Sequence, residues 1–211
     1  GSEMCIRDRA RVTRPSLPAL MPTHPAPSFR PGSIVRVACE HFVTYDAVEF
    51  RPGPHLNMIV GPNGTGKSTV VCAIALGLGW KPSVLGRAKD VASYVKLGHS
   101  QGWVEIELQG TESNVTIRRI LFRESNTSDW MLQGVPASAR QVHQAVSQFN
   151  IEVGNLCAFL PQDRVADFAA MTPSKLLQDT QHAAGHAQLS EWHAQLIDYG
   201  HQRAALDARL E

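Results

Sequence analysis

The spacing of apolar residues changes several times along the chain, and each spacing predicts a different element. Three short strand-like runs precede a Pro-Gly-Pro turn at residues 52–54, namely residues 34–37, 43–45 and 47–50. The apolar run Leu56–Val60 predicts a buried strand that leads directly into a glycine. Residues 68–78 combine helix-forming with small apolar residues and end before Gly79, so they predict a helix.

A second group of alternating residues predicts an antiparallel meander with one solvated face. Its strands are expected at residues 103–108, 115–118, 120–122 and 130–132, with a polar turn at 125–128. Ser138 and Gln141 form a candidate capping box at the start of a helix. The apolar face of that helix is expected to hold Val142, Ala145, Val146 and Phe149.

The last part of the chain has a heptad pattern. Apolar residues follow one another at steps of three and four at Leu189, Trp192, Leu196, Tyr199, Leu206 and Leu210, and Arg203 fills the remaining seam position. The pattern predicts the start of a coiled-coil arm over residues 176–211. The alternative is a terminal amphipathic helix that packs on its own domain. Because the heptads continue to Glu211, we expect the natural protein to extend further.

Composition is that of an ordinary globular protein. The chain has 211 residues, of which 43% are hydrophobic, and this is enough for one domain with a hydrophobic core. A net charge of +1 gives no support for a nucleic-acid partner from bulk charge. No apolar run reaches the roughly 18 residues that a membrane helix needs, so we expect no membrane association.

Residues 1–32 differ from the rest because prolines interrupt every periodic pattern, which predicts a disordered leader. Its first nine residues resemble a cloning or sequencing adaptor, and an Arg-rich mitochondrial presequence is the alternative, which the prolines oppose. The cysteines Cys5, Cys39, Cys72 and Cys157 form no CxxC pair and indicate a reducing compartment without a metal site. We therefore expect a leader at 1–32, a head at 33–175 and an arm from 176.

One segment matches the phosphate-binding loop, or Walker A motif, and lies between the predicted strand and helix: Gly61, Pro62, Asn63, Gly64, Thr65, Gly66, Lys67, Ser68 and Thr69. Its glycines allow backbone N–H groups to turn inward around phosphate oxygens, and the helix dipole adds positive potential. Lys67 is expected to reach the outer phosphates of ATP, and the Ser68 hydroxyl to bind Mg²⁺.

The form Pro62-Asn63-Gly64 resembles the loop of ABC-type ATPases. That resemblance implies a downstream glutamine that senses Mg²⁺ and the terminal phosphate. The segment Leu156–Asp163 is expected to supply it as a short apolar strand that delivers Gln162. The predicted fold is therefore α/β: the N-terminal half of an ABC-type P-loop NTPase head, with an antiparallel side sheet and the start of a coiled coil.

Two parts of an ABC-type ATPase site are missing from the sequence. The first is an apolar strand that ends in Asp-Glu, since Ile120–Glu124 carries Arg123 where the first acid should stand. The second is an LSGG-like signature motif. The chain alone is therefore expected to hold nucleotide without hydrolysing it, and ATPase activity is expected only of the full-length protein.

Three segments make the resemblance more specific: residues 86–98, 158–169 and 171–180. Their amino-acid sequences are similar to those of the structural maintenance of chromosomes (SMC) family, in the branch that pairs with SMC protein 6. The resemblance implies an ATP-driven, DNA-entrapping head that engages a second head when ATP binds. It also implies that Arg87 couples the ATP state to DNA; a plain surface arginine is the alternative.

The same resemblance implies the partners and the location. They are a heterodimer with SMC protein 6, a kleisin and other non-SMC element subunits, and single- and double-stranded DNA. The complex would act in DNA repair and recombination, on chromosomes in the nucleus. The implied cofactors are ATP and Mg²⁺.

Other functions and sites remain open from the sequence. A zinc-hook double-strand-break repair ATPase shares the head plan, an ABC transporter subunit shares the loop, and a scaffold with a vestigial loop would bind no ATP. His182, His186 and His193 have helical spacing for a metal, but no carboxylate or cysteine stands at ligand spacing. Basic residues that could contact DNA phosphates are Lys89, Arg118, Arg119 and Arg123.

Overall fold

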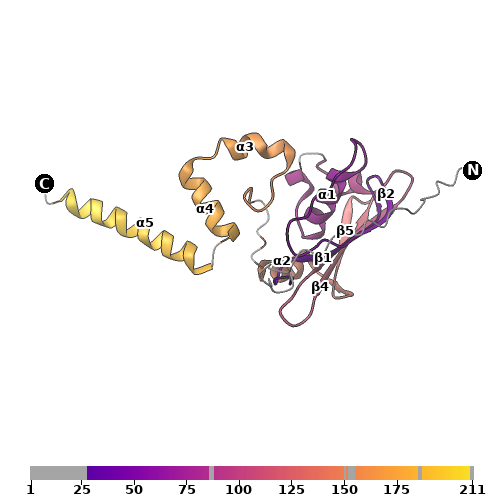
Figure 1. Cartoon of the computed structure of the whole chain (residues 1–211), viewed down its shortest axis with the longest axis horizontal. Helices are drawn as coiled ribbons and strands as arrows, with labels where there is room; N and C mark the ends of the chain where they lie inside the picture. Colours follow the sequence, from indigo (N-terminus) through magenta and orange to yellow (C-terminus); the bar gives the residue numbers. More distant parts are fainter. Residues whose placement is uncertain (1–27, 86–87, 150, 152–154, 185–186, 210–211) are drawn as a thin grey trace, which may run out of the picture.

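A computed structural model describes residues 28–85, 88–149, 151, 155–184 and 187–209. It consists of a twisted sheet with helix α1 against one face and a set of helices that leads away from it (Figure 1). The predicted leader lies mostly outside the described residues, as does Arg87. Among the helices that the structure describes, none has the length and apolar character to cross a membrane.

The sheet has six strands in the order β2-β1-β3-β4-β5-β6, and all neighbours are antiparallel. The strands are β1 (Ile34–Phe42), β2 (Tyr45–Phe50), β3 (Gln101–Leu108), β4 (Val115–Phe122), β5 (Thr127–Leu132) and β6 (Val135–Ala137). The meander predicted from alternation is thus confirmed, although its strands are longer than the patterns. Residues 115–118 and 120–122 belong to a single strand, and residues 43–44 form a turn.

Helix α1 (Lys67–Gly77) packs on the apolar face of the sheet and forms the core with it. The approach is close at Gly77, where an added Cβ would lie 2.5 Å from Ile106 Cγ1. Leu76 and Ile106 are fully buried, as are most of their neighbours. The helix predicted at 68–78 is confirmed as α1. Small residues along α1 allow its backbone to come this close to the sheet.

The opposite face of the sheet carries charged side chains, as its polar positions predicted. Arg36 Nε donates to Glu107 Oε2 at 3.1 Å, and Arg36 also pairs with Glu105. Arg118 Nε lies 2.6 Å from Glu105 Oε2, and its guanidinium stacks over Trp103 at 4.3 Å. These cross-strand contacts join β1, β3 and β4 on the solvated face. Hydrogen bonding to Glu105, partly opposed by burial, raises the pKa of Arg36.

Helix α2 (Ala139–Ser147) begins with the predicted capping box. The Ser138 hydroxyl accepts from Gln141 N at 3.3 Å, while Gln141 Oε1 accepts from Ser138 N at 2.8 Å. Val142 and Val146 are buried against the core, so the predicted apolar face is confirmed.

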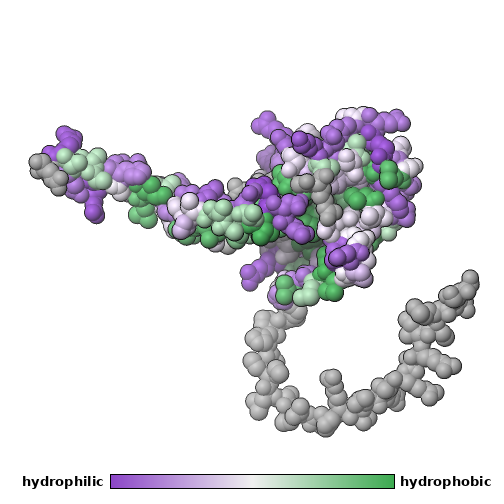
Figure 2. Space-filling model, turned by 90° about the horizontal axis from the view of Figure 1, so that it is seen from above, coloured by the Kyte–Doolittle hydropathy of each residue, from purple (hydrophilic) through white to green (hydrophobic). Residues whose placement is uncertain are grey.

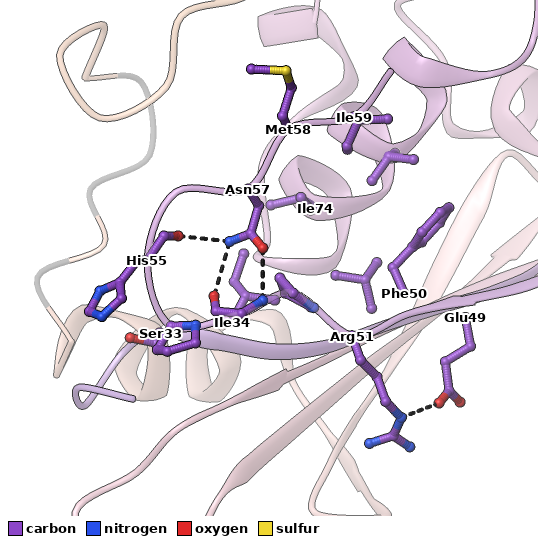
Figure 3. A pocket seen from close by; sticks show the side chains of 15 residues that line it. Ser33, Ile34, Glu49, Phe50, Arg51, His55, Asn57, Met58, Ile59 and Ile74 are labelled. Carbon is purple, nitrogen blue, oxygen red and sulfur yellow. Dashed lines mark hydrogen bonds and ion pairs between the residues drawn. The ribbon is translucent and has the colours of Figure 1, made fainter. Parts of the chain in front are cut away.

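The segment Leu56–Val60 is not a strand, and that prediction is wrong. It is a loop held by Asn57, whose amide donates to the carbonyls of Gly53 and His55 and accepts from Gly53 N (Figure 3). Leu56 is 91% exposed and Val60 is 81% exposed. Among the described residues no strand pairs with this loop, so most of its apolar side chains stay largely exposed.

An open cavity of about 720 Å³ lies between this loop, the first two strands and α1 (Figure 3). Its apolar walls include Ile34, Phe50, Ile59, Val70 and Ile74. The predicted parallel core strand is therefore absent from the described sheet, and an apolar recess stands at that place.

Short 3₁₀ turns connect the remaining elements: η1 (Pro82–Leu85), η2 (Val91–Tyr94) and η3 (Gln162–Arg164). Helix α3 (Val165–Ala169) follows η3 and leads to α4 (Pro173–Ala184) and α5 (Ala187–Asp207). Helix α5 extends away from the sheet (Figure 1), and Figure 2 shows apolar patches along it.

The heptad positions of α5 are exposed, including Trp192 at 56%, Leu196 at 68% and Leu206 at 57%. The alternative of a helix packed on its own domain is therefore wrong for the described residues. The coiled-coil arm stays a prediction, since the seam has no partner helix within that part of the chain.

Candidate nucleotide-binding site

The phosphate-binding loop wraps around the N-terminus of α1, as its glycine spacing requires. Gly66 is the N-cap residue with φ of +93°, and Gly64 has φ of +85°. No side chain caps the first backbone N–H groups of the helix. These donors and the helix dipole therefore face the loop, where phosphate oxygens would accept from them.

Lys67 reaches back across the loop. Its ammonium donates to the carbonyl oxygens of Gly61 and Pro62, each at 2.6 Å. The Thr65 hydroxyl donates to the same Pro62 oxygen at 2.8 Å and fixes the outer turn. An ammonium has three donors, so a phosphate oxygen in the loop can accept the remaining one. The residues present thus fit a nucleotide phosphate.

Tyr45 contacts the phosphate-binding loop from the sheet, and this contact was not predicted from the sequence. Its hydroxyl, at the start of β2, donates to the Gly66 carbonyl at 2.9 Å. Burial raises the pKa of this hydroxyl, so it remains a proton donor at neutral pH. No local pattern marks Tyr45, because the contact joins residues that are 21 positions apart.

Gln162 and Ser68 line the same cavity, of about 170 Å³. That they share a magnesium ion stays a prediction. The Asp163 carboxylate lines it too. Hydroxyl, amide and carboxylate oxygens are the ligands that Mg²⁺ prefers, so this donor set fits the ion. Gln162 begins η3 and follows a turn, so the short strand predicted within Leu156–Asp163 is wrong.

An aromatic contact holds this glutamine segment on the body of the protein. Phe159 meets Trp80 edge to face with 4.3 Å between ring centroids. Trp80 follows α1 and is 2% exposed. The contact replaces the sheet hydrogen bonds that a strand would have supplied.

Most of the predicted DNA-contacting arginines are used inside the fold. Arg119 is 7% exposed and donates to the backbone oxygens of Leu76 and Trp80, so its assignment to DNA is wrong. Arg123 donates to the backbone oxygens of His99 and Val95. Arg118 is paired with Glu105, whereas Lys89 is exposed.

The histidine cluster finds no support in the described part of the chain, where no group of three potential metal ligands occurs. His193 Nδ1 lies 2.6 Å from Gln181 Oε1, which accounts for its position. His186 lies outside the described residues.

The family model of the AAA domain matches residues 36–203. The chain belongs to the AAA domain family. Within it, the chain is 45% identical over 172 residues to structural maintenance of chromosomes protein 5 of Arabidopsis thaliana. It is 44% identical over 168 residues to the protein of the same name from Schizosaccharomyces pombe. The resemblance to SMC proteins is thereby confirmed.

These matches cover 81% and 79% of this chain but only 16% of each relative, so the chain spans about a sixth of their length. The Smc head domain of Pyrococcus furiosus, solved with an extended coiled coil and bound to the C-terminal domain of ScpA, has the same fold. The TM-score is 0.64 over 83% of this chain and 48% of that one, at 22% identity. The predicted α/β P-loop class is confirmed.

Proposed function

We propose that this chain is the ATP-binding part of an SMC head in which the phosphate-binding loop, Lys67 and Gln162 hold the nucleotide. The observation that carries the proposal is the loop at the N-terminus of α1, with Lys67 folded across it and Ser68 facing Gln162 over one cavity. The loop supplies backbone donors and an ammonium, and oxygen ligands line the cavity that begins at the next residue, Ser68. Together they are the donor set that a nucleotide phosphate with Mg²⁺ needs.

Each residue has a separate part in binding. Backbone N–H groups from Gly64 to Ser68 bind phosphate oxygens, and Lys67 binds the outer phosphates through its ammonium. Ser68 and Gln162 are proposed to hold Mg²⁺, which supplies charge neutralisation when bound. Pro62 and Asn63 shape the exposed rim of the loop.

ATP hydrolysis is proposed for the whole protein. In the described residues the segment around Arg123 is the end of a β-strand, and its guanidinium binds backbone carbonyls. No Asp-Glu pair follows it, so the acids for Mg²⁺ and the attacking water would come from elsewhere in the protein. The exposed Leu56–Val60 loop and its apolar recess support this view, because they offer a place for further core strands.

The partners and setting follow from the similarity to SMC protein 5 and are part of the proposal. We expect a heterodimer with SMC protein 6, joined by a kleisin and other non-SMC element subunits, that entraps single- and double-stranded DNA. Its place would be on chromosomes in the nucleus, in DNA repair and recombination. The ScpA-bound head of Pyrococcus furiosus supports a kleisin partner by its fold, and Arg87 remains the candidate that couples ATP to DNA.

The test is the affinity for ATP of the full-length protein in its complex, with Lys67→Ala as the variant. We expect a loss of at least about 100-fold, because an ammonium on the phosphates is removed while the fold is kept. Lys81→Ala is the matched control, since Lys81 is exposed and lies after the other end of α1. Equal affinity of wild type and Lys67→Ala would contradict the assignment of the site.

A further inference from the structure

We infer that Asn155 is a positioning residue that ties helix α4 to the segment carrying Gln162, so that α4 and the magnesium-facing glutamine move together. The inference rests on the proposed function, because it assumes that Gln162 holds Mg²⁺ and assigns the residue that positions it. Nothing in the sequence pattern singles out Asn155.

Asn155 is a buried polar residue, 7% exposed, between two parts of the chain. Its Nδ2 donates to the backbone oxygen of Asp179, in α4, at 2.8 Å. Its Oδ1 accepts from the backbone N–H of Cys157 at 2.9 Å. One side chain thus holds α4 with its donor and the glutamine segment with its acceptor.

The backbone around Asn155 strengthens the same joint. Its carbonyl oxygen accepts from Ala158 N at 3.1 Å and from Phe159 N at 3.0 Å, which closes a tight turn. Cys157 Sγ lies 3.6 Å from Thr180 Oγ1, a second contact with α4. The turn is therefore fastened to α4 over two consecutive residues of that helix.

The other end of the segment is fastened to the body of the protein. Phe159 packs on the buried ring of Trp80, and Leu160, Pro161 and Gln162 then line the cavity that Ser68 also lines. Because these contacts hold the turn against both α4 and Trp80, the helix, the turn and the backbone that leads to Gln162 shift as one unit while the contacts last. Breaking the joint instead would leave a buried amide without its partner, which is unfavourable.

A side chain that orients a metal-facing residue typically changes metal affinity or activity by about 10- to 100-fold when it is altered. Asn155→Asp keeps the acceptor for Cys157 N and removes the donor to Asp179. In the full-length complex we expect this variant to need about tenfold more Mg²⁺ for half-maximal ATP hydrolysis. ATP affinity without Mg²⁺ should stay within about twofold of wild type, because the phosphate-binding loop is untouched.

A double-mutant cycle with Gln162→Ala tests whether Asn155 acts through Gln162. We expect the double variant to match Gln162→Ala alone in its Mg²⁺ requirement. Independent, multiplying effects would overturn the inference, whereas a normal Mg²⁺ requirement in Gln162→Ala would contradict the proposed function of Gln162 itself. Asn114→Asp is the matched control, since it alters a hydrogen bond in the turn between β3 and β4 and should leave the Mg²⁺ requirement unchanged.

Hydrogen exchange on the wild-type complex gives a second test, which stands even where Asn155→Asp fails to fold. On addition of ATP and Mg²⁺, residues 155–162 and 176–182 should change protection together. A change confined to residues 155–162 would overturn the inference. Retained ATP binding in Lys67→Ala would instead contradict the proposed function, so the two failures are distinguishable.

Discussion

The Tyr45 hydroxyl donates to the carbonyl oxygen of Gly66 at 2.9 Å, and this bond joins the first hairpin to the phosphate-binding loop. The two residues approach so closely that a Cβ on Gly66 would lie 2.6 Å from the Tyr45 oxygen. The Tyr45 side chain of the sheet therefore fixes the position of Gly66, where the loop meets α1. The loop conformation thus depends on a residue outside the motif.

Tyr45→Phe should weaken ATP binding by about three- to tenfold, because a single neutral hydrogen bond contributes about 1 kcal/mol. The ring and its edge contact with Phe50 remain, so the fold should be kept. Isothermal titration with ATP measures the effect, and Tyr199→Phe on the exposed arm helix serves as the control. Unchanged affinity in Tyr45→Phe would show that the hydrogen bond does not hold the loop for binding.

Gly66→Ala should abolish measurable ATP binding, because φ of +93° costs an alanine about 1–2 kcal/mol and the added methyl would meet Tyr45. Gly98→Ala separates the two causes. Gly98 has φ of +86°, with nothing within 4 Å of an added Cβ, so it carries the backbone strain without the collision. We expect Gly98→Ala to lower stability slightly and to leave ATP affinity intact. Equal losses of affinity in both variants would contradict a specific role for the Tyr45 contact.

The parts of the fold that the sequence predicted well are those with local causes. The glycines and Lys67 have fixed spacing, Ser138 and Gln141 cap their own helix, and alternation on β3 and β4 follows from one buried face. These signals act within a few residues. They identified the loop, the capping box and the antiparallel sheet.

The predictions that failed depended on residues far away in the chain. Leu56–Val60 has the composition of a buried strand, but a strand needs neighbours, and the described chain provides none there. Gln162 lines one cavity with Ser68, yet a turn fastened by Asn155 and Phe159 leads to it, and not the predicted strand. Such contacts leave no periodic trace in the sequence.

Arg119→Met should destabilise the head by about 3 kcal/mol, or a fall in Tm of roughly 10 °C. The buried guanidinium donates to Leu76 O at 3.2 Å, Trp80 O at 3.0 Å and the Ser128 hydroxyl at 3.0 Å, and methionine leaves all three without this donor. Desolvation lowers the pKa of Arg119 to about 10, so the residue is still charged at neutral pH.

Arg118→Met is the matched control for Arg119→Met, because the neighbouring side chain points to the solvated face and is 36% exposed. Glu105 keeps Arg36 as a partner in that variant, so the loss should be below about 1 kcal/mol. Thermal unfolding followed by circular dichroism compares the two. A larger loss from Arg118 than from Arg119 would contradict the account of β4.

The stability of the sheet should fall in acid partly through Glu107. A hydrogen bond from Asn114 Nδ2 at 2.7 Å, together with Arg36, holds the pKa of Glu107 below its ordinary value of 4.5. Because the folded state binds this proton less readily, the contribution of Glu107 to stability is complete above about pH 4.5 and is lost as pH falls through the folded pKa.

Asn114→Ala should therefore cost about 1 kcal/mol of stability at pH 7 and progressively less below pH 4.5, measured by urea denaturation at a series of pH values. Gln109→Ala removes an amide that donates to a neutral backbone oxygen, at 3.1 Å from Gly110 O, so its cost should not vary with pH. Parallel pH profiles for the two variants would mean that Asn114 does not act through the charge of Glu107.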